Sequence, residues 1–349
     1  MKDYLVVVID SSSIDILLVT HEKKVQHVKQ IVTKYISNTE KTTSAHLEHL
    51  MLSALSDALK KVQLKAHIIS DVHIVLSSPW IVSKTKTTHI TFPKPFIIDQ
   101  AYIDTIIEQE RTAFKKIFPF DVEFVEQKVF EVKINGYHAK ARIKSPAISL
   151  TVSSAMSAMS KKVVKKITDA IEHYFHNDRI SFHSSSILTY VGMRQYTPDI
   201  DSGVYINVHG ECTDITLFRN GTPTHFASLN KGYHSVVTAL AKALRTSNSV
   251  ADSKINLLEN GDIAESVEEK VLPVIHKQLD EWQKAVTELI LDLEQTDTLP
   301  RNIIVDNYEH SELFIDTLKN IYSASDITGI PEEMANIYIT GIELVEFHK

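Results

Sequence analysis

Three hairpin-linked strands followed by a helix occur twice in this sequence, and no other feature limits the possible folds as much. The first unit has strand-like runs at residues 4–9, 14–20 and 25–33, and then a helical pattern that Ser44 is expected to cap. The second has runs at 204–208, 213–218 and 222–229, and then a helical pattern at about 233–244. This repetition predicts an α/β fold in which two duplicated halves face each other across a cleft.

The ends of the first strands are the expected meeting place of the two halves. Asp10 follows the first strand of the first unit. Asn207 is predicted to hold the same place in the second unit, 207 − 10 = 197 residues later. Asn220-Gly221 is a strong signal for a two-residue hairpin turn, so the last two strands of the second unit are expected to be antiparallel neighbours.

A different segment, roughly residues 74–146, lies between the two units. Asp99 is positioned to cap a helix whose apolar residues are predicted to point inward: Ile103, Ile106, Ile107, Phe114 and Ile117. Further strands are predicted at 122–125, 129–134 and 138–143, the last two joined at Asn135-Gly136. The segment is therefore predicted to form a small α+β insert.

The C-terminal third is predicted to be mainly helical. Pro273 is expected to start a long amphipathic helix that continues to about residue 293. A buried strand is predicted at 302–306. Residues 337–349 are predicted to form a strand and a short polar tail, which has no apolar face to bury in a bilayer.

Glycine is scarce, with 9 in 349 residues, against a usual share of about 7%. No two glycines are two, three, four or five positions apart. The motifs GxGxxG, GxxxxGK and GxSxG are therefore absent, and with them the usual Rossmann, P-loop and α/β-hydrolase signatures.

Charge and cysteine content exclude further classes. Lys and Arg number 37 and Asp and Glu number 44, so the formal net charge is 37 − 44 = −7, which does not suit a dedicated nucleic-acid binder. No apolar run reaches the roughly 20 residues that cross a bilayer, and the N-terminus lacks the pattern of a signal peptide. Cys212 is the only cysteine, so no internal disulfide is possible and the cytoplasm is the expected location.

Two short motifs at the strand ends resemble the phosphate loops of the actin-like ATPases. Ile9-Asp10-Ser11-Ser12-Ser13-Ile14 is similar to the first loop of that family, DIGSSSIK. Asn207-Val208-His209-Gly210-Glu211-Cys212-Thr213-Asp214-Ile215 is similar to the second, DIGGGTTDI. The insert lies where the FtsA and PilM members carry an extra small domain, and residues 130–153 resemble the FtsA version. The resemblance covers nearly the whole chain.

This resemblance implies an actin-like fold, in which two duplicated RNase H-like halves carry an inserted small α+β subdomain. The implied domains are a first half at 1–73 and 147–200, an inserted subdomain of the FtsA/PilM type (an SHS2 domain) at 74–146, a second half at 201–229 and 300–349, and a helical subdomain of the second half at 230–299.

In such a fold the N–H groups of two hairpin turns cradle the phosphates of ATP, and carboxylates hold Mg²⁺ through water. The resemblance thus implies ATP and Mg²⁺ as ligands, with Asp10 holding Mg²⁺ through water. The implied nucleotide-binding residues belong to the two loops, to a glycine-containing turn and to a late turn that packs beside the adenosine: Asp10, Ser11, Ser12, Ser13, Asn207, His209, Gly210, Glu211, Thr213, Gly232, Asp306 and Asn307.

The sequence departs from the family pattern at three places. Ser11 replaces the glycine of the first loop, and Asn207 replaces the leading aspartate of the second. Asp306-Asn307-Tyr308 stands where the family has a Gly-Gly turn. Because asparagine brings no negative charge to Mg²⁺, little or no ATP hydrolysis is expected, and ATP binding itself is left open.

Some of these residues also have a purely structural interpretation. Asp10 at a strand end is a common turn former, and Thr213 and Asp214 are consistent with a turn cap. His209 is expected to be a solvent-exposed turn histidine rather than a catalytic one. Glu211 next to Cys212 should raise the pKa of the thiol, which opposes a nucleophilic role.

The resemblance favours an actin-fold scaffold of the FtsA type, acting in bacterial cell division near the membrane, which associates with itself or with an FtsZ-like filament protein. A PilM-like cytoplasmic component of type IV pilus assembly, with a PilN-like partner, is the first alternative. A small-molecule kinase of the same fold is the second, and the scarcity of glycine opposes it. The inner face of the cell membrane would be reached only through a partner, and no nucleic acid is expected to bind.

Overall fold

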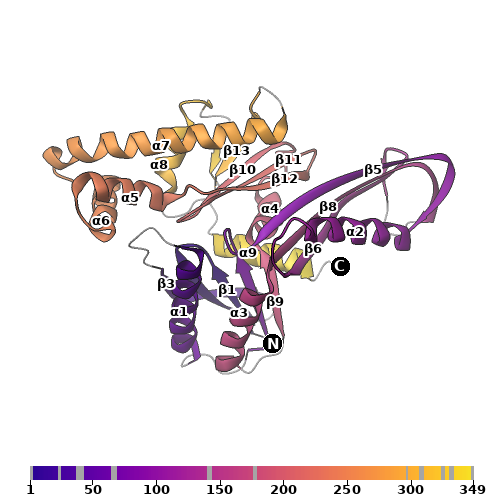
Figure 1. Cartoon of the computed structure of the whole chain (residues 1–349), viewed down its shortest axis with the longest axis horizontal. Helices are drawn as coiled ribbons and strands as arrows, with labels where there is room; N and C mark the ends of the chain where they lie inside the picture. The colour runs from indigo at the N-terminus through magenta and orange to yellow at the C-terminus, as the bar shows by residue number, and fades with distance from the viewer. Residues whose placement is uncertain are drawn as a thin grey trace.

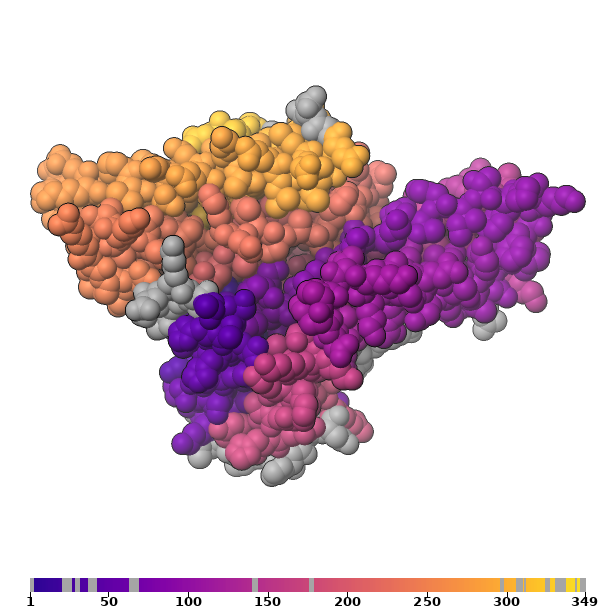
Figure 2. Space-filling model, in the orientation of Figure 1, coloured from indigo at the N-terminus to yellow at the C-terminus, as the bar shows by residue number. Residues whose placement is uncertain are grey.

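The computed structural model describes residues 3–22, 25–36, 43–63, 69–139, 144–175, 179–295, 298–305, 310–323, 327–329 and 334–346. Figure 1 shows two halves that face each other and an insert that projects to one side. The space-filling view in Figure 2 shows the insert extending away from the two halves as a separate lobe.

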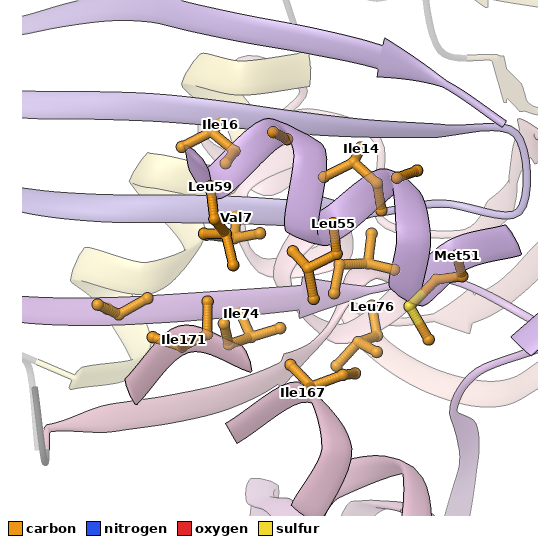
Figure 3. Close-up of a cluster of buried hydrophobic side chains, with 14 of the residues drawn as sticks. Val7, Ile14, Ile16, Met51, Leu55, Leu59, Ile74, Leu76, Ile167 and Ile171 are labelled. Carbon is orange, nitrogen blue, oxygen red and sulfur yellow. The ribbon is translucent and has the colours of Figure 1, made fainter. Parts of the chain in front are cut away.

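The first half is built on a five-stranded mixed sheet with the order β3-β2-β1-β4-β9. Its strands are β1 (Tyr4–Ile9), β2 (Ser13–Glu22), β3 (Val25–Tyr35), β4 (Asp71–Leu76) and β9 (Ile180–Ser184). Strand β1 is buried on both faces, which explains its continuous apolar sequence. Helices α1 (Ser44–Gln63) and α3 (Lys161–Phe175) cover one face, and Figure 3 shows their aliphatic side chains packed on the sheet.

The second half repeats this topology, with the order β12-β11-β10-β13-β14. Its strands are β10 (Gly203–Val208), β11 (Thr213–Arg219), β12 (Thr222–Leu229), β13 (Ile303–Val305) and β14 (Ile327–Gly329). Its helices are α5 (Tyr233–Leu244), α6 (Asn248–Glu259), α7 (Glu265–Glu294) and α8 (Ser311–Leu318). In both halves the first strand lies between an antiparallel and a parallel neighbour. The predicted duplication is confirmed.

Two helices lie between the sheets, α4 (Ser185–Tyr196) and α9 (Met334–Glu346). A Cβ on Gly192 of α4 would lie 2.4 Å from the carbonyl oxygen of Ile337, and one on Gly341 of α9 would lie 2.5 Å from that of Leu188. The two helices therefore cross with their backbones in contact. The prediction of a strand at the C-terminal end is wrong, because Tyr338, Ile342 and Val345 follow a helical spacing and bury one face against the first half.

The insert forms an antiparallel sheet with the order β5-β8-β6-β7. Its elements are β5 (Val82–Asp99), α2 (Gln100–Lys115), β6 (Val122–Ile134), β7 (Tyr137–His138) and β8 (Lys144–Ser160). Asp99 caps α2 as predicted, accepting the N–H of Tyr102 at 3.0 Å. The predicted boundaries at 74 and 146 fall inside β4 and β8, because both strands run continuously past them.

Three local predictions are corrected by the structure. Ile117 is 57% exposed, because α2 ends before it. Pro273 lies inside α7, whose first turn carries the acidic residues Glu265 and Glu268 that favour a helix N-terminus. Ser44 is already the first residue of α1, and the hydroxyl of Thr43 accepts the N–H of His46 at 3.3 Å. No helix in the described ranges is long and apolar enough to cross a membrane.

Candidate functional site

The turns after β1 and β10 have the same backbone form. The N–H of Asp10 donates to the carbonyl of Ser13 at 2.9 Å, and that of His209 donates to the carbonyl of Cys212 at 2.8 Å. Asp10 directly follows Ile9, which pairs with Ile14 just before the turn, and His209 directly follows Val208, which pairs with Thr213 in the same way. Asp10 and His209 are therefore equivalent, 209 − 10 = 199 residues apart. The predicted equivalence of Asp10 with Asn207 is wrong, because Asn207 lies within β10, opposite Asp214.

The two turns are in direct contact. The N–H of Glu211 donates to Oγ of Ser11 at 3.0 Å, which joins residues 200 positions apart. A Cβ on Gly210 would lie 2.4 Å from Cβ of Ser12. Because such an approach leaves no room for a side chain, only glycine fits at position 210 with the turns this close.

His209 lies between two carboxylates. Its Nδ1 is 3.1 Å from Oδ1 of Asp10, and its Nε2 is 3.3 Å from Oδ2 of Asp214. Asp10 and His209 are 6% exposed and Asp214 is 4% exposed. The expectation of a solvent-exposed His209 is wrong, because the side chain points into the junction of the two halves rather than into solvent.

The charges of Asp10, His209 and Asp214 follow from their geometry. A ring with a carboxylate oxygen within 3.3 Å of each nitrogen is favoured as the doubly protonated imidazolium, because its positive charge then faces both carboxylates. Burial alone would lower the pKa of His209, but the negative charges of Asp10 and Asp214 raise it well above its ordinary value. Burial would raise the pKa of Asp10 and of Asp214, and His209 instead holds both below the usual value.

The two tryptophans of the chain support the two turns. The indole N–H of Trp80 donates to the carbonyl of Asp10 at 3.0 Å. The indole N–H of Trp282 donates to Oγ1 of Thr213 at 2.9 Å, and this hydroxyl donates in turn to the carbonyl of Lys231 at 2.7 Å. Neither contact could be predicted from the sequence, since each tryptophan lies about 70 residues from its partner.

The start of α5 packs under the second turn. A Cβ on Gly232 would lie 2.3 Å from the carbonyl oxygen of His209, and the N–H of Tyr233 donates to that same oxygen at 3.0 Å. The ring of Tyr233 stacks on His310, with centroids 4.1 Å apart. His310 was not among the predicted site residues, and its ring is also paired with Glu259.

The structure gathers most of the predicted site residues in one place. The residues in contact at the two turns are Asp10, Ser11, Ser12, His209, Gly210, Glu211 and Gly232, with Ser13, Asn207 and Thr213 at the adjoining strand ends. Asp306 and Asn307 lie outside the described residues. Asp214 was not predicted as a site residue, and its role follows from its burial within β11, since a buried carboxylate needs a partner.

These turns do not fit the phosphate tail of a bound Mg²⁺–ATP as they stand. The N–H of Glu211 is taken by Ser11, and the carboxylate of Asp10 accepts the hydroxyl of Ser12 at 3.0 Å as well as facing His209. Within the described ranges, no group of three or more His, Cys, Asp or Glu side chains is placed to hold a metal ion. The role of Asp10 in holding Mg²⁺ through water stays a prediction, and its carboxylate faces Ser12 and His209 here.

Cys212 lies beside this site and is buried. Burial, together with the nearby carboxylates, raises the pKa of its thiol to about 12, so the thiolate needed for nucleophilic attack is not available at neutral pH. A cavity of about 260 Å³ adjoins it, lined by residues that include Ser78, Ser83, Asp214 and Ser228.

The duplicated sheets and the paired turns define the actin-like ATPase fold. Among solved structures, a PilM–PilN type IV pilus biogenesis complex matches with a TM-score of 0.61 and 12% identity, over 98% of this chain and 95% of that one. The ethanolamine utilization protein EutJ from Carboxydothermus hydrogenoformans matches with a TM-score of 0.53 and 9% identity, over 99% and 90% of the two chains. MreB 5 of Spiroplasma citri bound to AMPPNP matches with a TM-score of 0.50 and 10% identity, over 100% and 97%.

At these identities the likeness establishes the fold, and the expectation of an actin-like fold is confirmed. No protein-family model and no curated protein matches the sequence.

Proposed function

We propose that this chain is an actin-fold scaffold of the PilM type, which acts by binding another protein rather than by turning over ATP. The observation that carries the proposal is the pairing of Asp10 and Asp214 with His209. A carboxylate that is already paired with an imidazolium is a poor ligand for hydrated Mg²⁺, and ATP hydrolysis in this kind of site depends on positioning and charge.

A PilN-like protein is the partner that the comparisons favour. The matched PilM structure is a complex with PilN, and it covers 98% of this chain. The insert exposes apolar side chains that a protein partner could cover, among them Phe96, Ile97, Tyr137 and Ile148. We propose a cytoplasmic location at the inner face of the membrane, reached through this partner.

The FtsA-type role in cell division, with an FtsZ-like partner or self-association, remains the second candidate. Its support is the sequence resemblance of residues 130–153, which form much of β6 and β8 in the insert. The PilM-type proposal has the structural match in addition, and we rank it first for that reason.

The test is calorimetry of the purified full chain against three ligands: the soluble part of a PilN-like protein, an FtsZ-like protein, and a panel of sugars and acetate with ATP. The PilM-type proposal expects binding to the first and no phosphoryl transfer. Binding to the FtsZ-like protein alone would favour the division role. Turnover of roughly 1 s⁻¹ or more with a small substrate would identify a kinase and defeat both scaffold proposals.

A further inference from the structure

We propose that His209 takes the place of a bound cation in this chain and ties the two halves together at their turns, so that the cleft stays closed without nucleotide or metal. The contacts that carry this proposal involve only the chain's own residues, and they would hold whichever protein the chain binds.

The ring of His209 links one half to the other. Asp10 belongs to the first half, and His209 and Asp214 belong to the second. The contact between His209 and Asp10 therefore crosses the cleft, while Asp214 fixes the other side of the ring within its own half. The N–H of Ser78, which follows β4 of the first half, donates to Oδ2 of Asp214 at 3.4 Å and makes a second crossing.

The charges match those of a cation site. Two buried carboxylates that approached one place without compensation would repel each other, and one of them would take up a proton. One imidazolium between Asp10 and Asp214 supplies the positive charge that this pair requires. A divalent ion is the usual alternative, and the ring already faces one oxygen of each carboxylate.

The ring of His209 also occupies space that is open in the second phosphate-loop motif of the actin-like ATPases. In DIGGGTTDI the place aligned with His209 is a glycine, which has no side chain. Here that place carries an imidazole, and the neighbouring Gly210 and Glu211 already touch Ser12 and Ser11 of the opposite turn. With both backbone and side chain engaged, the closed arrangement of the turns is complete without a ligand.

The first test is calorimetry of the full chain with Mg²⁺ alone and with Mg²⁺–ATP, for the wild type, for His209→Gly and for His89→Gly. His89 is an exposed histidine of the insert on β5, so His89→Gly controls for introducing a glycine. His209→Gly is expected to bind Mg²⁺–ATP at least about tenfold more tightly than the wild type, because it frees Asp10 and Asp214 and opens the space. His89→Gly is expected to match the wild type.

Two results of this titration would overturn the proposal. One is a wild type that binds Mg²⁺–ATP with a Kd below about 100 μM, since the ring would then give way readily. The other is a folded His209→Gly whose affinity stays within about threefold of the wild type.

A second measurement uses only the wild type, in case His209→Gly does not fold. Diethylpyrocarbonate modifies accessible imidazole nitrogens, and mass spectrometry locates the modified residues. His209 is expected to resist modification, with or without Mg²⁺–ATP, while the exposed His46 and His49 of α1 react. Modification of His209 at the rate of His46, or its exposure on addition of Mg²⁺–ATP, would contradict the proposal.

Discussion

The turns after β1 and β10 share one backbone design and carry opposite charges. Asp10 and His209 make the same hydrogen bond to the residue three positions ahead and hold equivalent places in the two duplicated units. Because the halves face each other, these two residues meet. Duplication thus decides where the turns lie, and the chemistry of two side chains decides whether they bind a ligand or each other.

The two turns also differ in what supports them. The first turn is held by Trp80, which is partly exposed and follows β4. The second is held by Trp282 of α7, which is fully buried, and it rests on the start of α5 at Gly232. The second turn is therefore built into the core of its half, and it should tolerate change less well than the first.

The largest effect is expected for Gly232→Ala. A Cβ there would lie 2.3 Å from the carbonyl oxygen of His209 and 2.8 Å from the backbone nitrogen of Cys212, neither of which can yield without moving the turn. We expect a loss of about 4 kcal/mol in the free energy of unfolding, measured by chemical denaturation. Gly329→Ala is the matched control, because a Cβ there meets nothing within 4 Å, and equal losses for the two variants would refute the tight packing under the second turn.

The next effect is a loss of stability at low pH, and it comes from a residue that differs between the parallel strand pairs of the two halves. His73 of β4 is paired with Val6 of β1, and the equivalent pair in the second half is Ile304 with Tyr205. Burial, assisted by His183 whose ring nitrogen lies 3.1 Å away, lowers the pKa of His73 from 6.5 to about 4. The first half therefore has an acid-sensitive histidine at this position, where the second half has Ile304.

The direction in which stability changes with pH follows from proton binding at His73. Between pH 6.5 and about 4 the unfolded chain binds a proton at His73 that the folded chain does not, so stability falls as the pH is lowered through this range. The contribution of His73 is a loss of about 3 kcal/mol, complete near pH 4. The free energies of unfolding of the wild type and of His73→Gln, from chemical denaturation at a series of pH values, should diverge by this amount, and parallel pH profiles would show that His73 does not carry the effect.

A smaller effect tests the contact between the turns. In Gly210→Ala the new Cβ would lie 2.4 Å from Cβ of Ser12, and we expect a loss of about 2 kcal/mol in stability. Ser12→Gly removes the opposing atoms, so the double variant should recover most of the loss. Because the two residues belong to different halves, recovery in denaturation experiments would demonstrate the contact, whereas additive losses would place the turns apart.

The smallest effect compares the two tryptophans. Trp282→Phe removes a fully buried hydrogen bond to Thr213 and leaves a cavity, while Trp80→Phe acts at a partly exposed site. We expect Trp282→Phe to cost about 1 kcal/mol more than Trp80→Phe in the free energy of unfolding. A larger cost for Trp80→Phe would reverse the ranking of the two turns.

The local pattern of the chain was sufficient to predict most elements and several turns. Strand and helix periodicity depends on neighbours a few residues apart, and the duplicated order of elements followed from it. Both Asn-Gly hairpin turns are present, with positive φ at Asn135, Gly136, Asn220 and Gly221, because the left-handed backbone they need is a property of those residues alone. The C-terminal helix was missed, since a short apolar run fits a strand or a buried helix equally well.

The site was decided by contacts that no local pattern contains. The sequence by itself placed Asp10, Ser11, His209 and Gly210 at strand ends and so at the junction of the halves. Only the tertiary structure brought Asp10 and Asp214 to opposite sides of His209. The physical reason is that burial and charge pairing depend on which side chains of the other half lie opposite. The contact of Glu211 with Ser11, for example, joins residues that are 200 positions apart in the chain.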